Sequence, residues 1–171
     1  SDDGATPIMR AVKKAETLWL QEEDTKSYVS TIGNAAFRDT MNALIFGEDN
    51  PALSNGRLAS AQATGGSGAL RLGAELIVAA NPNAAVWVST PTWANHIPLI
   101  SSAGLELKSY PYYNRETLGV NFDDMVAHLE DNAVAGDVLL LHGCCHNPTG
   151  ADLSPAQWDR IADLLLEKKM T

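Results

Sequence analysis

The chain has 171 residues, of which 45% are hydrophobic and 19% are charged, and its formal net charge is −9. This length suits one domain with a buried core, and the composition is that of a globular protein. The negative charge argues against nucleic acid and anionic membrane surfaces as partners, because both bind basic proteins.

The first part of the chain predicts two helices. Thr6-Pro7 has the form of a helix start. Apolar residues then recur on one helical face, at Ile8, Val12, Ala15 and Trp19. A second helix is expected over residues 34–46, and Gly47 marks its end.

From residue 57 onward, short apolar runs alternate with helical segments. Strands are expected over residues 57–63, 85–89, 105–110 and 138–142. Helices are expected over residues 69–80, after Pro91, after Asn121 as N-cap, and after a capping box of Ser154 and Gln157. This alternation predicts an α/β fold with a mainly parallel sheet and helices on both faces. Ligands bind beyond the carboxyl ends of such strands, so residues 64–68, 90–96 and 143–150 are the candidate stretches.

The first candidate stretch lies within SAQATGGSGALRLGAEL, where three glycines precede a helix. A strand, glycines and a helix in this order direct free backbone N–H groups and the positive helix end at a phosphate. The stretch is not a Walker A loop, and Arg71 occupies the third glycine position of the dinucleotide fingerprint. The alternative is a glycine turn that lets the helix pack tightly on the sheet.

The second candidate stretch is STPTWANH, which follows the strand AVWVS. Trp93 offers a flat face for stacking on a planar ring. His96 comes about one helical turn later and could reach the same pocket. The alternative places Trp93 in the core and leaves His96 as a hydrogen-bonded surface histidine.

The third candidate stretch, LHGCCHNPTG, contains four potential metal ligands: His142, Cys144, Cys145 and His146. No metal is expected, because there is no Cys-x-x-Cys pair and neighbours on an extended chain point to opposite sides. A nucleophilic cysteine with a histidine base is a second interpretation, for which the sequence offers no orienting partner. Adjacent cysteines rarely meet disulfide geometry, so we expect free thiols in a reducing compartment, the cytoplasm by default.

The same stretch ends in Asn147-Pro148-Thr149-Gly150, which is a turn signal. Asn147 could present its side-chain amide to a ligand at this point. The alternative is a plain turn without a role in binding.

Together and in this order, these stretches resemble the class I, fold-type I pyridoxal-phosphate aminotransferases, in the aspartate and aromatic amino acid branch. The likeness covers nearly the whole chain and is carried by TPIMRAVKKAE, TKSY, LIFGED, AQATGGSGALRLGAEL, VWVSTPTWANH, SAGLELKSYPYYN and LHGCCHNPTGADLSPAQW. It implies that residues 12–171 form the N-terminal half of the large cofactor-binding domain, incomplete at its C-terminal end. Residues 1–11 would belong to the small domain or to a connecting segment.

The resemblance also implies which residues bind the cofactor, pyridoxal 5′-phosphate. Gly65, Gly66 and Ser67 match the loop that holds its phosphate at a helix N-terminus. Trp93 matches the aromatic residue that stacks on the pyridine ring. Asn147 matches the asparagine that bonds the cofactor 3′-oxygen and, with Trp93, contacts the substrate.

Three further residues have supporting roles in the resemblance. His96 matches a histidine behind the carboxylate that pairs with the pyridine nitrogen, and His142 matches a histidine near the ring. Tyr28, in TKSY, matches the tyrosine that reaches the phosphate of the neighbouring subunit in a homodimer.

The implied activity is transfer of an amino group from an L-amino acid to a 2-oxo acid. Aspartate with 2-oxoglutarate is the first choice, and aromatic amino acids are the alternative. The Schiff-base lysine is expected downstream of Thr171, so no catalytic residue is assigned within the chain. We therefore expect an internal fragment of a longer enzyme that is inactive alone. A non-catalytic binding module without this lysine is the alternative from another class.

Overall fold

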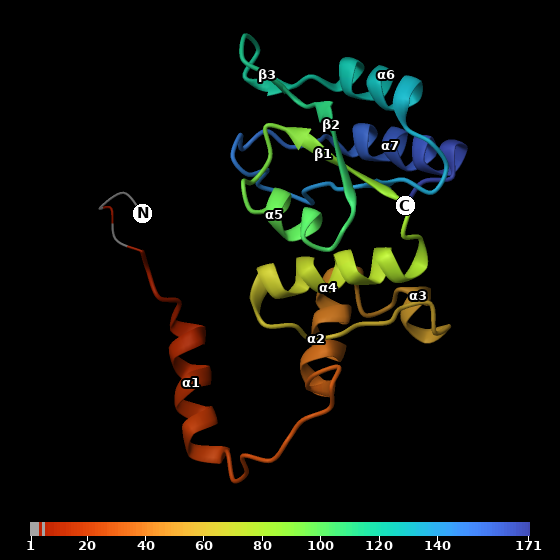
Figure 1. Cartoon of the computed structure of the whole chain (residues 1–171). Helices are drawn as coiled ribbons and strands as arrows, with labels where there is room; N and C mark the ends of the chain where they lie inside the picture. Colours follow the sequence, from red (N-terminus) through yellow and green to blue (C-terminus); the bar gives the residue numbers. More distant parts are fainter. Residues whose placement is uncertain (1–3, 5) are drawn as a thin grey trace. The chain divides into compact units, whose positions relative to one another are not determined.

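The computed structural model describes residue 4 and residues 6–171. It divides the chain into two compact units, Ser1–Ala61 and Gln62–Thr171. The described part of the first unit contains the helices α1 (Arg10–Glu22), α2 (Ala35–Phe46) and α3 (Pro51–Ser54), which Figure 1 colours red to orange.

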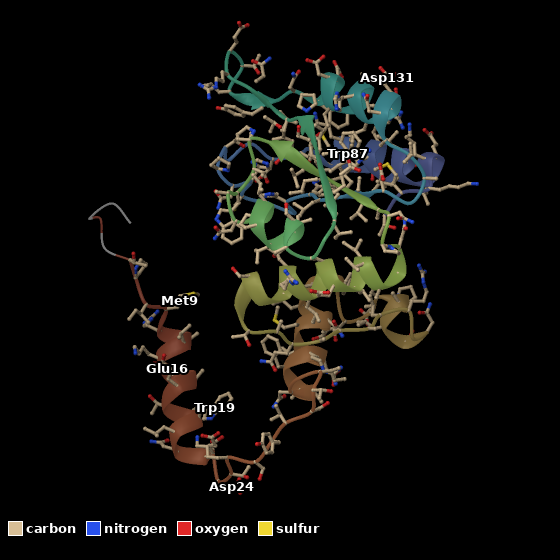
Figure 2. All side chains as sticks on the ribbon, viewed as in Figure 1. Met9, Glu16, Trp19, Asp24, Trp87 and Asp131 are labelled. Carbon is tan, nitrogen blue, oxygen red and sulfur yellow. The ribbon has the colours of Figure 1, made fainter. Side chains whose placement is uncertain are left out.

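Helix α1 begins at Arg10, three residues later than the Thr6-Pro7 signal predicts. Proline is tolerated in a first helical turn but does not by itself create one. Ile8 is 64% exposed, so no packing stabilises an additional turn. The apolar residues Met9 and Trp19 also project from this segment and are largely exposed (Figure 2).

Helix α2 confirms the predicted second helix. Asn34 is its N-cap and accepts a hydrogen bond from the Phe37 N–H at 3.0 Å. Gly47 ends it with a φ of 86°, a conformation that glycine adopts without a Cβ penalty.

The predicted strand over residues 57–63 is wrong, because this segment pairs with no strand in the part of the chain that the structure describes. Ser60 is held by side chains of α2 instead. Arg38 donates to its carbonyl oxygen at 3.2 Å, and Asn42 donates to its hydroxyl oxygen at 3.1 Å. Alternation of apolar and polar residues is thus not enough for a strand, which also needs a neighbouring edge.

The second unit is an α/β unit, which confirms the predicted fold class. Its elements are α4 (Gly65–Ala80), β1 (Ala85–Thr90), α5 (His96–Ser101), β2 (Glu106–Pro111), β3 (Tyr113–Asn114), β4 (Gly119–Val120), α6 (Phe122–Asn132), β5 (Val138–Leu139) and α7 (Pro155–Lys168). A parallel sheet has the order β2-β1-β5, and β3 pairs with β4 in an antiparallel ribbon.

Helices cover both faces of the parallel sheet, as the alternation of strands and helices predicts. Val86 and Val88 of β1 point into one hydrophobic cluster with residues of α4 and α5, including Ala74 and Ile100. Trp87 points to the other face of the sheet. There it belongs to a second hydrophobic cluster, whose members include Tyr110, Met125, Leu129, Ile161 and Leu164. Figure 1 shows α6 and α7 on one side of β1 and α4 and α5 on the other.

One helix start in this unit differs from the predictions. Helix α4 begins at Gly65 rather than at residue 69, so the glycines form its first turn. Asn121 is the N-cap residue of α6, as predicted; its side chain makes no capping bond to the backbone, and its amide donates to the Asp124 carboxylate at 2.7 Å. The capping box at the start of α7 is confirmed, since Ser154 and Gln157 exchange hydrogen bonds between side chain and backbone.

The strand predicted over residues 138–142 is shorter than expected. Only Val138–Leu139 form β5, although the Leu140 N–H still donates to the Trp87 carbonyl at 2.9 Å. Among the described residues, no strand pairs with the second edge of β5. Without that neighbour the ladder stops early, and of residues 138–142 Leu139 alone is buried.

Helix α7 offers a matched test of the core. Leu164 is 1% exposed and Leu166 is 79% exposed, two residues apart on the same helix. We expect Leu164→Ala to lower the free energy of unfolding by about 2–5 kcal/mol, because it leaves a cavity. Leu166→Ala should change it by about 0.5 kcal/mol or less. Urea unfolding measures both, and equal losses would contradict this core assignment.

Candidate functional site

The residues that follow β1 and β5 meet in a row of contacting rings. The Trp93 and His96 rings meet edge to face with centroids 5.3 Å apart. His96 contacts His142 in the same manner at 5.1 Å. His142 stacks on His146 at 4.3 Å, and His146 stacks on Tyr112 at 4.0 Å. The sequence-predicted residues Trp93, His96 and His142 are therefore brought together.

Asn147 joins this row through its backbone, whose N–H donates to His142 Nδ1 at 3.1 Å. Since His142 Nδ1 accepts, the proton of the neutral ring lies on Nε2. His142 Nε2 is buried and has no hydrogen-bond partner among the described residues. A buried N–H without an acceptor is costly, so this donor indicates a site that another group completes. The side chain of Asn147 is exposed.

The cluster favours uncharged histidines. His96 is 6% exposed and its Nδ1 lies 2.8 Å from Thr92 Oγ1. Burial lowers the pKa of His96, and the neighbouring His142 lowers it further. Burial also lowers the pKa of His142, against the opposing effect of Asp152.

His146 is the most deeply buried member of the cluster, at 2% exposure. Its Nε2 lies 2.9 Å from Ser89 Oγ, and its Nδ1 lies 2.8 Å from Thr149 Oγ1. Burial, reinforced by His142, lowers its pKa to about 4. In the sequence, His146 stands out only as a potential metal ligand, and its partner Ser89 lies 57 positions away.

Asp152 fixes the backbone that leads from the two cysteines into the turn at residues 147–150. Its carboxylate accepts hydrogen bonds from the N–H groups of Cys145 and His146, both at 2.8 Å. These bonds lower the pKa of Asp152. Cys144 and Cys145 are free and exposed, and a hydrogen bond with Cys144 raises the pKa of the Cys145 thiol. A raised pKa is the opposite of what a nucleophilic cysteine needs.

The glycine stretch forms an open helix end. Gly65 has a φ of 66°, and a Cβ added at Gly65 or Gly66 would meet no atom within 4 Å. Thr64, at the N-cap, makes no side-chain capping bond, and no acidic residue lies in the first turn. The first N–H groups of a helix have no partner within the helix. Backbone donors at Gly65, Gly66 and Ser67 are thus accessible, and all three residues are exposed.

Of the candidate binding residues, Tyr28 alone belongs to the first unit, and its side chain is fully exposed. In the second unit, α4 and β1 run in opposite directions in the view of Figure 1. The amino end of α4 and the carboxyl end of β1 therefore lie on the same side of that view.

Among the described residues, no group of three His, Cys, Asp or Glu side chains is arranged to hold a metal ion. None of the helices that the structure describes is both long and apolar enough to cross a membrane.

A model of the family aminotransferase class I and II matches residues 1–171, the whole chain. The chain belongs to this family. Members of the family depend on pyridoxal phosphate, and the resemblance found in the sequence is thereby confirmed.

Similar curated proteins carry both of the expected substrate names. A tyrosine aminotransferase of Klebsiella pneumoniae is 43% identical over 99% of this chain and 43% of its own length. An aspartate aminotransferase of Haemophilus influenzae is 42% identical over 94% of the chain and 40% of its own length. The chain therefore spans less than half of the length of these relatives.

Solved structures agree with the fold. An aromatic-amino-acid aminotransferase from Burkholderia pseudomallei, covalently bound to pyridoxal phosphate, matches with a TM-score of 0.94 and 40% identity. The match covers 99% of this chain and 42% of that one. The cytoplasmic aspartate aminotransferase of Saccharomyces cerevisiae matches with a TM-score of 0.92 and 30% identity, over 99% and 41% of the two chains. The second unit therefore has the fold of the family's fold-type I enzymes.

The low pKa of His146 predicts a loss of stability in mild acid. The folded chain keeps His146 neutral down to about pH 4, whereas the unfolded chain binds a proton near pH 6.5. The contribution of His146 to stability is thus complete above about pH 6.5 and falls as the pH is lowered toward 4. Urea unfolding across this pH range should give a steeper dependence for the wild type than for His146→Gln. The same slope in both proteins would contradict the assignment.

Proposed function

We propose that the enzyme containing this chain transfers an amino group from an L-amino acid to a 2-oxo acid with pyridoxal 5′-phosphate as cofactor. The observation that carries this proposal is the contact row of Trp93, His96 and His142, to which Asn147 is hydrogen-bonded. It lies at the carboxyl ends of parallel strands, where α/β sheets bind ligands. Family membership supports the same conclusion.

The residues of the second unit fit this cofactor. The open first turn of α4 offers backbone N–H groups and the Ser67 hydroxyl to its phosphate. The half-buried ring of Trp93 leaves apolar surface for stacking on the pyridine ring. The unpaired His142 Nε2 marks a place where a further acceptor is required.

Each of these residues has a defined task in the proposed reaction. When bound, pyridoxal phosphate supplies an electron sink for the negative charge that develops at the substrate α-carbon. The α4 terminus and Ser67 would hold the phosphate, and Trp93 would stack on the ring. The exposed amide of Asn147 would donate to the cofactor 3′-oxygen and help to position the substrate carboxylate. His96 and His142 would support the site as uncharged rings in contact with each other.

Aspartate with 2-oxoglutarate is our first choice of substrates, and aromatic amino acids are the alternative. The names of the relatives support both, because tyrosine and aspartate aminotransferases are almost equally similar. An aromatic amino acid aminotransferase from Psychrobacter sp. B6, at 40% identity and a TM-score of 0.92, was cocrystallised with aspartic acid. The two substrate classes are therefore compatible with one fold.

The visible absorption spectrum of the purified enzyme with pyridoxal phosphate tests the function. We expect a band of the bound cofactor that decreases when L-aspartate is added and returns with 2-oxoglutarate. A decrease with L-phenylalanine and not with aspartate would select the aromatic alternative. Absence of any cofactor band would contradict the proposal and favour a non-catalytic binding module.

Two variants of Trp93 test, with the same spectra, whether this residue stacks on the cofactor. Trp93→Ala should shift the cofactor band and weaken cofactor binding, because stacking is lost. Trp93→Phe retains an aromatic face and should bind the cofactor more tightly than Trp93→Ala. An unchanged spectrum and turnover in Trp93→Ala would contradict this position.

We further propose a homodimer in which Tyr28 reaches the phosphate bound by the second subunit. Two observations support it: the full exposure of Tyr28 and its location in a separate compact unit. Tyr28→Phe should raise the cofactor dissociation constant roughly tenfold, since a hydrogen bond to a charged group is lost. Dialysis of the holoenzyme followed by measurement of the retained cofactor tests this. Equal retention in wild type and variant would exclude the role.

Two further proposals concern the domain organisation and the cellular compartment. We propose that residues 12–171 belong to the cofactor-binding domain and residues 1–11 to the small domain or a connection. The two free thiols, Cys144 and Cys145, support a reducing compartment such as the cytoplasm. Location of the tagged enzyme in an oxidising compartment would overturn that assignment.

A further inference from the structure

The ring of His146 is bonded at both nitrogens to groups from different segments. Ser89 lies near the end of β1, and Thr149 lies in the turn after Asn147. His146 thus connects the strand that precedes Trp93 with the turn that carries Asn147. No part of the proposed reaction uses this buried imidazole directly.

The hydrogen bonds of this connection have a single consistent direction. Ser89 Oγ donates its one proton to the Pro91 carbonyl at 2.9 Å, so it accepts from His146 Nε2. The neutral ring then has no proton on Nδ1, which accepts from the Thr149 hydroxyl. Thr149 Oγ1 in turn accepts from the Ala151 N–H at 3.2 Å. A directed chain of bonds therefore runs from Ala151 to Pro91.

The orientation of the His146 ring is also fixed by its faces. The Tyr112 ring stacks on the His146 ring with centroids 4.0 Å apart and an interplanar angle of 17°. The His142 ring also stacks on the His146 ring, at 4.3 Å and 27°. The Tyr112 hydroxyl donates to the Ala151 carbonyl at 2.7 Å, which anchors the far side of the turn. Rotation of the imidazole would break these contacts together.

We propose that His146 is a positioning residue that holds Asn147 in the binding site through Thr149. Asn147 follows His146 directly and precedes Thr149 by two residues, so both flanks of Asn147 are tied to one buried ring. The Gly150 N–H closes the turn on the His146 carbonyl at 2.7 Å. The exposed amide of Asn147 therefore projects from a fixed backbone. This inference rests on the proposed function, in which Asn147 contacts the cofactor.

A matched pair of variants tests the connection in the full-length enzyme. Thr149→Val keeps the shape of the side chain and removes the hydroxyl, whereas Thr149→Ser keeps the hydroxyl. We expect Thr149→Val to raise the dissociation constant of pyridoxal phosphate roughly tenfold, because a buried acceptor loses its donor. Thr149→Ser should remain near the wild-type value. Equal dissociation constants in the two variants would overturn the proposal.

Coupling to Asn147 separates positioning from general stabilisation. In an Asn147→Ala background, Thr149→Val should cause no further loss of cofactor affinity, because the residue that it positions is absent. The same fold-loss in both backgrounds would overturn the proposal. His146→Gln can donate to Ser89 through its amide but has no acceptor at the position of Nδ1 beside Thr149, and should behave as Thr149→Val. Circular dichroism confirms that each variant is folded.

Hydrogen exchange of the Asn147 amide gives a measurement that does not depend on the cofactor. Its N–H is bonded to His142 Nδ1 in the folded chain. In the apoenzyme, Thr149→Val should speed its exchange roughly tenfold, and Thr149→Ser should not. Unchanged exchange in Thr149→Val would refute the positioning role. A wild type that binds no pyridoxal phosphate would refute the proposed function alone, and this exchange result would still decide the role of His146.

Discussion

The strand β1 is the element on which the second unit depends, because it is paired on both edges and covered on both faces. Parallel ladders join it to β2 and β5. Val86 and Val88 enter one hydrophobic cluster, and Trp87 enters the other. A strand fixed in this manner has little freedom at its carboxyl end. Ser89, the last residue but one of β1, is therefore a rigid anchor for the groups that bind to it.

The second constraint on the site is that its three histidines remain uncharged. Three imidazoles in contact cannot carry charges in a buried place without losing hydration and repelling one another. The pKa values of His96, His142 and His146 are accordingly all lowered. Neutral rings have one donor and one acceptor each, so their hydrogen bonds acquire a direction. The same condition keeps positive charge out of the cluster that contacts Trp93, the residue proposed to stack on the cofactor ring.

Local signals in the sequence predicted those parts of the fold that local interactions stabilise. The caps of α2 and α7 and the strands β1 and β2 were found close to their observed bounds. The strand expected over residues 57–63 failed because strand formation depends on a partner edge that alternation does not report. In the site, the resemblance named Trp93 and His142, and the structure joins them through ring contacts. The sequence could not reveal the hydrogen bond between His146 and Ser89, since these residues lie 57 positions apart and meet only after folding.

The glycines before α4 had two interpretations in the sequence, tight packing or approach of an anion. If tight packing were the reason for these glycines, a side chain in place of each glycine would collide with the neighbouring sheet. A Cβ at Gly65 or Gly66 would meet nothing within 4 Å, and at Gly68 it would make ordinary contacts at 3.7 and 3.9 Å. Packing within the second unit therefore does not demand these glycines, although the positive φ of Gly65 favours one there. Bare backbone at an open helix end also permits the close approach of a ligand, which agrees with the phosphate site proposed for this turn.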